Sequence, residues 1–380
     1  MLELIATSTF GLESIVKDEL TNLGFEITAV ENGQITFRSD FYGLAKANLW
    51  LRCAERVFLK IGEFPARDFD ELYENTRNLP WEDWLPVNAK FPVTGKSVKS
   101  ALHSVPACQS IIKKAIVDRL KEKYRKEWFE EDGPLYPIYF ALHKDLLTIS
   151  INTSGEGLHK RGYRELTTEA PLQETLAAAM LYLSRWHPDR ILIDPFCGSG
   201  TIPIEAALLG RNIAPGIQRH FVAEEWSQIG KKIWQEAREE AKDLESDNLS
   251  FRLVMGTDID AGAIKIARHH AIKAGVEEYI HFQTASFEEF QSSRKYGCII
   301  TNPPYGERLA DKKEVEKLYR LMGRKLLTFD TWSFYILTSY QGFEKLFGKR
   351  GNKRRKLYNG GIECQFYQYY GPLPPADKEI

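Results

Sequence analysis

Several features that would assign the chain to a special class are absent from its 380 residues. No apolar stretch reaches the roughly 18 residues that a transmembrane helix needs. The first residues, MLELIATSTFGLESIVKDEL, carry acids where a signal peptide has its basic region. The sequence therefore predicts neither secretion nor a membrane partner, and we expect a cytoplasmic protein.

Cysteine is scarce, and its pattern fits neither a zinc site nor a disulfide framework. The chain has five cysteines and no C-x-x-C pair, which argues against a zinc site and against a disulfide framework. No other arrangement of side chains calls for a metal. The tetrapeptide TGKS at 94–97 is not a phosphate-binding loop, because Lys90 stands where that motif requires glycine.

Excess charge is also absent overall, but not locally. The net charge is −1, yet residues 90–126 hold ten basic residues against two acids, and residues 345–356 hold seven against none. Clustered cations on a neutral chain predict a local contact to RNA, and the alternative is the solvated face of ordinary helices. From these clusters we expect RNA contacts by Lys113, Lys114, Arg354 and Arg355, the last two on a mobile loop.

The chain has an ordinary globular composition, with 43% hydrophobic and 27% charged residues, and its length suggests two or three domains. Residues 1–60 alternate strand and helix, with an Asn32-Gly33 hairpin signal. An amphipathic helix at 108–124 and a hairpin ending near 154 follow. From residue 172 short apolar strands alternate with helices. This pattern predicts an α/β, Rossmann-like doubly wound parallel sheet preceded by an α+β region.

A glycine-containing turn follows a buried strand in ILIDPFCGSGTIPIEAA. Gly198 and Gly200 allow the backbone to approach a ligand, and the helix after them favours an anionic group. The spacing is not G-x-G-x-x-G, so a nicotinamide site fits poorly. The next strand ends in GTDID, where Asp258 is placed to accept ribose hydroxyls. The two patterns together favour a nucleoside cofactor over a purely structural turn.

The strand YGCIITNPPYG ends in two prolines, which cannot continue a sheet ladder. The resulting rigid corner fixes the Asn302 amide and presents the Pro303 carbonyl. Two such acceptors can each take one N–H of an exocyclic amine, whose lone pair is otherwise delocalised into a base. Tyr305 can stack on that base. The alternative is a turn that only ends the strand.

The D-P-F-C-G-S-G-T and N-P-P-Y motifs resemble those of class I S-adenosylmethionine-dependent amino-methyltransferases. With L-H-K-R-G-Y-R and A-P-L-Q-E-T-L-A-A, the chain resembles the bacterial THUMP-domain RNA methyltransferases, related to the N-terminal half of the large-subunit ribosomal RNA guanine-N2 methyltransferase. The resemblance implies a ferredoxin-like subdomain at 1–60, a THUMP domain at 61–155 and a methyltransferase domain at 165–380.

The resemblance also implies roles for individual residues. S-adenosylmethionine is the expected cofactor, and Ser286 stands where relatives often carry an acid near the adenine. The catalytic loop would be Asn302, Pro303, Pro304 and Tyr305. The expected cofactor-binding residues are Pro171, Thr175, Asp194, Pro195, Phe196, Cys197, Gly198, Ser199, Gly200, Thr201, Asp258, Ile259 and Ser286.

Two segments remain to be placed. Where the two halves join, GLHKRGYR interleaves an aromatic residue with cations, so we expect RNA backbone contacts there, by Lys160, Arg161, Tyr163 and Arg164. The polar segment 211–247 is expected to form a loop and a charged helix over the active-site side.

The expected function is methyl transfer from S-adenosylmethionine to an exocyclic base amine of RNA, most simply guanine N2 of 23S ribosomal RNA. The base must be unpaired or flipped out to enter such a pocket. Three alternatives stay open: a transfer RNA guanine-N2 methyltransferase, an adenine-N6 DNA methyltransferase, and a non-catalytic RNA-binding ribosome-assembly factor. The absence of a helix-turn-helix favours RNA over DNA. No pattern specifies an oligomeric state.

Overall fold

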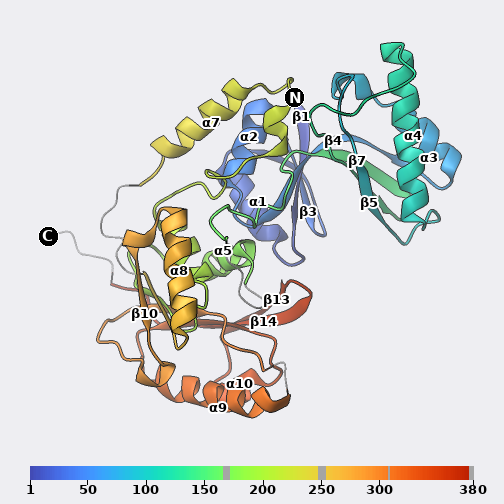
Figure 1. Cartoon of the computed structure of the whole chain (residues 1–380). Coiled ribbons are helices and arrows are strands. Elements are labelled where there is room, and N and C mark those ends of the chain that lie inside the picture. The colour runs from blue at the N-terminus through green and yellow to red at the C-terminus, as the bar shows by residue number, and fades with distance from the viewer. Residues whose placement is uncertain (166–171, 247–253, 307–308, 376–380) are drawn as a thin grey trace. The chain divides into compact units, whose positions relative to one another are not determined.

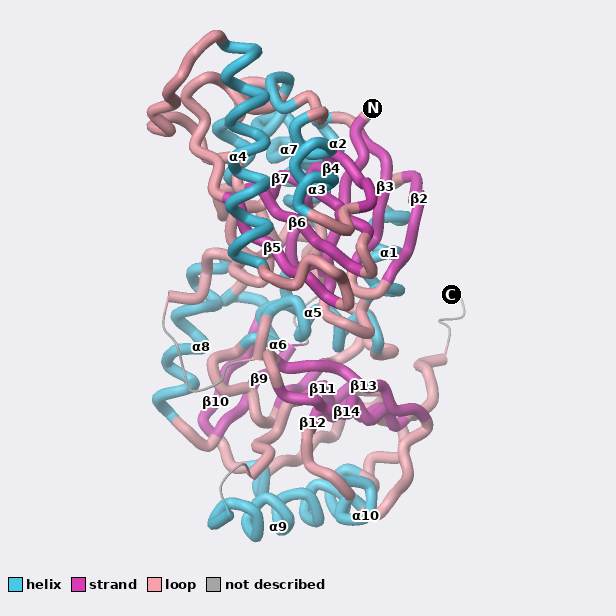
Figure 2. The backbone as a smooth tube through the Cα atoms, turned by 90° about the vertical axis from the view of Figure 1, so that its right-hand side faces the viewer, coloured by secondary structure: helices cyan, strands magenta, loops and turns pink. Residues whose placement is uncertain are grey.

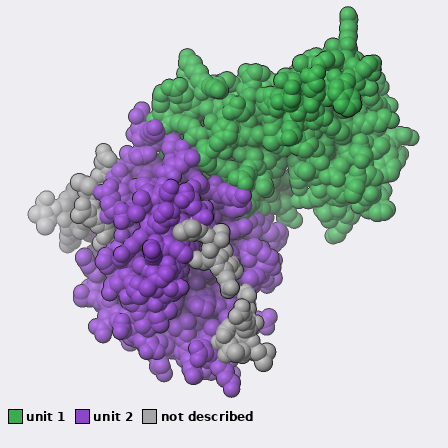
Figure 3. All heavy atoms as spheres, viewed as in Figure 1, with its two compact units in different colours: residues 1–8, 16–158, 219–240 green, residues 9–15, 159–218, 241–380 purple. Residues whose placement is uncertain are grey.

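The computed structural model describes residues 1–165, 172–246, 254–306 and 309–375. The chain forms two compact units, shown in two colours in Figure 3. Unit 1 contains Met1–Ser8, Val16–Leu158 and Arg219–Glu240, and unit 2 contains Thr9–Ile15, His159–Gln218 and Ala241–Ile380.

Unit 1 contains one seven-stranded sheet in the order β2-β3-β1-β4-β7-β6-β5. The twelve-residue strand β4 pairs with β1 on one side and β7 on the other, so the first and second halves of the unit share this sheet (Figure 1). The expected Asn32-Gly33 hairpin joins β2 to β3, with Gly33 at φ 76°. The elements are β1 (Leu2–Ser8), α1 (Glu13–Asn22), β2 (Glu26–Glu31), β3 (Gln34–Ser39), α2 (Phe41–Trp50), β4 (Ala54–Pro65), α3 (Phe69–Arg77), η1 (Trp81–Asp83), β5 (Val93–Val98), α4 (Val105–Tyr124), β6 (Ile138–His143) and β7 (Leu146–Asn152).

Residues 219–240 return to unit 1 after the chain has entered unit 2. They include the short helix η2 (Val222–Glu225) and most of α7 (Lys231–Asp243). The Trp226 indole donates to the Leu135 carbonyl at 2.9 Å and stacks on Tyr136 with the ring centroids 4.7 Å apart. The expected charged helix is therefore present, and the segment that carries it packs in unit 1.

Unit 2 contains a second seven-stranded sheet, in the order β10-β9-β8-β11-β12-β14-β13. The first five strands in this order are parallel to one another. β14 runs antiparallel to both of its neighbours, β12 and β13. The chain reverses direction across the sheet at β8, which is the expected doubly wound topology. The elements are α5 (Glu174–Leu183), β8 (Leu192–Asp194), α6 (Thr201–Gly210), β9 (Val254–Asp258), α8 (Ala261–Ala274), η3 (Glu277–Tyr279), β10 (Ile280–Thr284), η4 (Phe287–Glu289), β11 (Cys298–Thr301), α9 (Leu309–Leu326), β12 (Ser333–Thr338), α10 (Phe343–Phe347), β13 (Lys353–Asn359) and β14 (Ile362–Tyr369).

Helices lie on both faces of this sheet (Figures 1 and 2). On one face, α9 and α10 bury an aromatic cluster that includes Tyr319, Phe343 and Tyr367. On the other face lie α5 and α6, whose residues are almost all buried, together with α8. Both faces are covered, so the central strands β8, β11 and β12 are buried along their whole length.

The segment from 345 to 361 differs from its expected form. It is not a mobile loop but the end of α10, a short turn and the hairpin strand β13, which pairs with β14 along its whole length. Leu357 on β13 faces Cys364 on β14, and both are buried. These apolar positions fix the strand despite its high charge. None of the helices in the described part of the chain has the length and apolar character of a membrane span.

Candidate active site

The turn after β8 depends on two glycines with positive φ. Gly198 has φ 51° and Gly200 has φ 86°, a region that favours glycine. A Cβ on Gly200 would lie 2.9 Å from the Cβ of Ala267 on α8, so the close packing of α6 on α8 also requires glycine. A Cβ on Gly198 would meet no atom within 4 Å. The turn therefore holds its shape while leaving open space beside Gly198.

Asp258, at the end of β9, is bound to this turn. One carboxylate oxygen accepts the Gly198 N–H at 2.9 Å, and the other accepts the Asp260 N–H at 3.0 Å. A carboxylate has about four lone-pair positions. Two backbone bonds orient the group and leave acceptor positions for a ligand.

Asp194 connects the turn to the Asn-Pro-Pro-Tyr loop. Its Oδ1 accepts the Phe196 N–H at 3.1 Å and the Thr301 hydroxyl at 2.6 Å. Thr301 is the last residue of β11, beside β8 in the parallel sheet. Burial raises the pKa of Asp194 to about 7, and the Thr301 and Phe196 bonds oppose that rise. Asp194 thus holds the two motifs together at the carboxyl ends of neighbouring strands.

The Asn-Pro-Pro-Tyr loop is held from two sides. The Tyr319 hydroxyl on α9 donates to the Pro304 carbonyl at 2.7 Å. The Tyr305 hydroxyl donates to Asn302 Oδ1, and the Cys364 thiol on β14 lies 3.6 Å from the same hydroxyl. Burial raises the pKa of Tyr305 far above its ordinary value, so this hydroxyl remains a donor.

One cavity of about 1090 Å³ joins these parts. It runs from the turn after β8, past the ends of β9 and β10, to the Asn-Pro-Pro-Tyr loop and α9. Ligands of doubly wound folds bind in this position, outside the carboxyl ends of the strands. The lining residues are Pro195, Phe196, Asp258, Ile259, Ser286, Phe287, Glu288, Asn302, Pro303, Pro304, Tyr305, Glu314, Val315, Lys317, Leu318, Leu321, Arg324, Asn359 and Ile362.

The structure divides the expected cofactor residues into two groups. Pro195, Phe196, Asp258, Ile259 and Ser286 line the cavity. The residues of the second group do not line the cavity, and all of them except Gly198 are buried. The members of this group are Thr175, Asp194, Cys197, Gly198, Ser199, Gly200 and Thr201. Pro171 lies outside the described residues.

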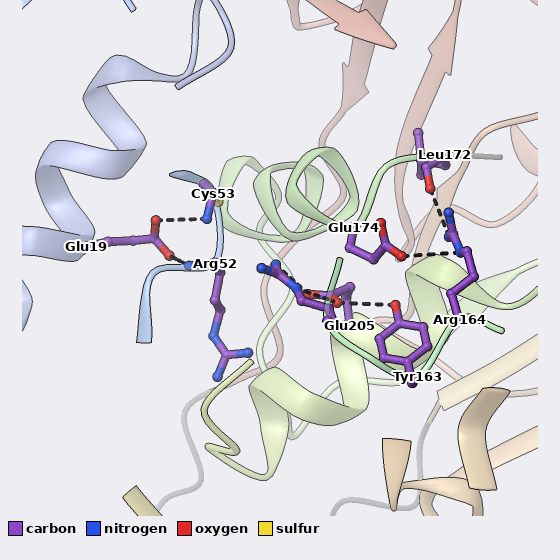
Figure 4. A network of polar contacts seen from close by, with 9 residues as sticks. Glu19, Arg52, Cys53, Tyr163, Arg164, Leu172, Glu174 and Glu205 are labelled. Atoms are coloured by element: carbon purple, nitrogen blue, oxygen red, sulfur yellow. Dashed lines mark hydrogen bonds and ion pairs between the residues drawn. The ribbon is translucent and has the colours of Figure 1, made fainter. Parts of the chain in front are cut away.

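The expected RNA contacts of Arg161 and Tyr163 are wrong. Arg161 is 3% exposed and Tyr163 is 2% exposed, and both bind the buried carboxylate of Glu205 on α6. Figure 4 shows the bond from Tyr163 to Glu205. A buried cation needs a paired acid, which explains the bond to Glu205.

The expected RNA contact of Arg164 is corrected in the same way, because its guanidinium is bound within the chain. Its guanidinium donates to the Thr201 hydroxyl at 2.6 Å and to the Leu172 carbonyl at 3.0 Å, and it pairs with Glu174 (Figure 4). These bonds join α5 to the first residue of α6, so the GLHKRGYR segment is mainly a structural support for the cofactor helix. Lys160 in the same segment is exposed.

Of the other residues expected to contact RNA, two bind groups within the chain. Lys113 lies over the Phe91 ring and binds Glu131 and the Phe91 carbonyl. The Arg355 guanidinium donates to the Gly11 carbonyl at 2.6 Å and to the Ser14 hydroxyl at 3.0 Å. Internal contacts therefore occupy both cations. Lys114 and Arg354 are exposed.

Sequence reasoning missed the far wall of the cavity. Glu314, Lys317, Leu321 and Arg324 on α9 line it at helical spacing, and this spacing was the available signal. Asn359, near the hairpin turn, also lines it. No motif distinguishes that asparagine in the sequence.

The doubly wound sheet, the glycine turn and the Asn-Pro-Pro-Tyr loop around one cavity define a class I methyltransferase that uses S-adenosylmethionine. Three family models match: an RlmL ferredoxin-like domain at residues 3–58, a THUMP domain at 66–152, and an RMKL-like methyltransferase domain at 161–368. The chain belongs to this RMKL-like methyltransferase family.

Two curated relatives carry names that concern RNA. "Putative RNA methyltransferase YpsC" of Bacillus subtilis (strain 168) is 46% identical over 99% of this chain and 98% of its own length. The ribosomal RNA large subunit methyltransferase K/L of Syntrophotalea carbinolica is 34% identical over 97% of this chain. This chain spans only 53% of that relative's length.

Two solved structures share the whole fold. SMU.472, solved with SAH, is 42% identical over 98% of this chain and 99% of its own, with a TM-score of 0.92. A Listeria monocytogenes protein named a "predicted N6-adenine-specific DNA methylase" is 51% identical over 98% of this chain and 96% of its own, with a TM-score of 0.93.

Proposed function

We propose that the chain transfers a methyl group from S-adenosylmethionine to an exocyclic amine of an RNA base, and that this amine is N2 of a guanine in 23S ribosomal RNA. The observation that carries the proposal is the single cavity shared by Asp258, Asn302 and Pro303. A cofactor site and an amine-accepting site thus open into one space.

The residues present fit the cofactor. Asp258 lines the cavity with its carboxylate already oriented by two backbone N–H groups, so it can accept hydroxyls of a ribose. The open space beside Gly198 leaves room for a ligand against the turn. When bound, S-adenosylmethionine supplies a methyl group activated by its sulfonium. The chain itself has to position the amine and exclude water.

The amine is oriented by two acceptors. Asn302 Oδ1 and the Pro303 carbonyl each accept one N–H, which draws the nitrogen lone pair out of conjugation with the base. Thr301 and Tyr319 fix the loop on either side of these acceptors. The Tyr305 ring stacks on the base, after its hydroxyl has left Asn302 Oδ1.

RNA as the substrate is supported by the THUMP domain match and by the names of the curated relatives. Large-subunit ribosomal RNA is proposed because a curated relative is named a ribosomal RNA large subunit methyltransferase. Guanine N2 is proposed from the resemblance of the motifs to those of the guanine-N2 methyltransferases. The Listeria relative's name favours a second candidate, an adenine-N6 DNA methyltransferase, whose amine would use the same two acceptors.

The test is nucleoside analysis after methyl transfer in vitro. Ribosomal RNA, transfer RNA and genomic DNA from cells lacking the protein are treated with purified protein and methyl-labelled S-adenosylmethionine. We expect label in N2-methylguanosine from the 23S fraction. Label confined to transfer RNA, or to N6-methyladenine in DNA, would replace this proposal with the corresponding alternative. No transfer and no cofactor binding by calorimetry would favour a non-catalytic factor.

A further inference from the structure

The two basic segments of the chain differ in how many of their cations are neutralised. On and just after α4, cations form ion pairs with acids, as Arg119 does with Glu82 at 2.6 Å. Such pairs leave little net positive field for a polyanion. The ion-paired cations of this region are Lys113, Arg119, Lys121, Lys123 and Lys126.

The segment from α10 into β13 has the opposite character. Glu344, which lies within the segment's first helix, accepts the Gly351 N–H at 2.7 Å and so shapes the turn. Lys356 pairs with Glu363, and Arg355 is held by backbone and hydroxyl oxygens. Within the described residues, five exposed cations of this segment form no ion pair: Lys345, Lys349, Arg350, Lys353 and Arg354. These five residues form the cationic hairpin surface.

The cationic hairpin surface leads to the active-site cavity. β13 is the edge strand of its sheet (Figure 2), and its last residue, Asn359, lines the cavity. Lys353 is on the same face of β13 as Asn359 and precedes it by six residues, which is about 20 Å along a strand. A nucleic acid strand held at this surface would therefore have its bases within reach of the Asn-Pro-Pro-Tyr loop.

We propose that the cationic hairpin surface binds the phosphates of the RNA strand that delivers the target base to the cavity. The inference rests on the proposed function. It assigns the phosphate contact to the methyltransferase unit rather than to α4 and the residues just after it, which hold as many cations in the sequence. Unpaired cations release counterions from RNA when they bind, whereas ion-paired cations must first lose their acids.

The test compares two double variants that remove the same charge. K353S/R354S changes the cationic hairpin surface, and K121S/K123S changes paired cations of α4. Binding of a short fluorescein-labelled single-stranded RNA is followed by anisotropy across a salt series. The slope of log K against log salt is negative, and each lost phosphate contact makes it less steep by about 0.7 for a single strand. We expect the slope of the hairpin variant to become less steep by about 1.4, and that of the α4 variant by less than half as much.

An equal loss in the two variants, or an unchanged slope in the hairpin variant, would overturn the inference. Cofactor affinity by calorimetry and the urea unfolding midpoint verify that each variant is folded. Methyl transfer to 23S RNA by the wild-type protein separates the two proposals. If the wild type methylates RNA while the hairpin variant binds RNA normally, the proposed phosphate contact at the cationic hairpin surface is wrong and the proposed function stands. If the wild type methylates no RNA, the proposed function fails first.

Discussion

Two polar clusters in unit 2 are built from similar residues but are completed in different ways. The closed network consists of Arg161, Tyr163, Arg164, Glu174 and Glu205, and each member binds another member or its neighbours (Figure 4). The cavity set consists of Asp258, Asn302 and Tyr305, which line the 1090 Å³ cavity, and of Asp194, which is 2% exposed and accepts hydrogen bonds from Phe196 and Thr301. Sequence reasoning assigned residues of both clusters to binding. The difference teaches that a polar residue serves a ligand only where the fold leaves acceptors or donors facing open space.

The charge balance of the closed network agrees with a structural role. Two arginines face two glutamates, and the side chains of Arg161 and Glu205 are 2% and 0% exposed. Burial raises the pKa of Glu174, and the charge of Arg164 opposes the rise. Such a network has no net charge to offer to a ligand. It fixes how α5 and α6 pack, and thereby where the cofactor turn begins.

Asn302→Ala most directly tests whether the cavity set, unlike the closed network, acts on a ligand. This change removes an acceptor that acts on the amine, so we expect methyl transfer to fall by about 10² to 10³-fold, the usual effect of losing one such polar group. Cofactor affinity and the urea unfolding midpoint should remain those of the wild type. A parallel loss of cofactor affinity would show that Asn302 supports the fold and would end the distinction between the two clusters.

Glu205→Ala should have the largest effect on stability. It leaves Arg161 buried without its carboxylate, which typically costs about 3–5 kcal/mol. Urea unfolding measures the loss, and Glu278→Ala on the exposed η3 helix is the matched control, with an expected change near zero. A stable Glu205→Ala protein that no longer transfers methyl groups would place the closed network in the chemistry instead.

The ionisation of Asp194 should make the relative affinity for S-adenosylmethionine and S-adenosylhomocysteine depend on pH. Burial raises its folded-state pKa to about 7, from an ordinary pKa of 3.8, so its contribution to folding is present at low pH and is lost as pH rises through 7. A cationic ligand favours the ionised form. The ratio of S-adenosylmethionine affinity to that of neutral S-adenosylhomocysteine should therefore rise between about pH 6 and pH 8, by at most tenfold per pH unit.

Calorimetry across that pH range measures the ratio directly. Asp194→Asn is the control, because it cannot titrate, and the ratio should then be flat. A wild-type ratio independent of pH would show that Asp194 belongs with the closed structural residues.

Tyr305→Phe should have the smallest effect. It keeps the ring but removes the hydroxyl that occupies Asn302 Oδ1 in the free protein. One hydrogen bond has a net value of about 0.5–1.5 kcal/mol, so the KM for RNA should fall by about two- to tenfold while kcat stays nearly constant. Tyr305→Ala, which removes the stacking ring, should raise KM. A fall in kcat for Tyr305→Phe would mean that the hydroxyl orients Asn302 during the reaction.

Some parts of the site were predictable because local sequence fixes them. Gly198 and Gly200 sit at positive φ in a turn between strand and helix, and two prolines after Thr301 end β11. Carboxyl ends of parallel strands meet at one edge of a sheet, so the two motifs were expected to lie close together. The hairpin at 353–369 was not predicted, because its charges hide the alternation that buries Leu357 and Cys364.

The sequence by itself determined the order of strands and helices, the glycine turn, the diproline corner and hence the class of chemistry. These features depend on backbone conformations available to a few residue types. Only the tertiary structure decided which charges are available. Arg161 and Lys113 are cations like Arg354 in the sequence, but their partners Glu205 and Glu131 lie 44 and 18 positions away. Long-range packing brought those acids to the cations, because burying a charge requires a partner, and no local pattern encodes that partner.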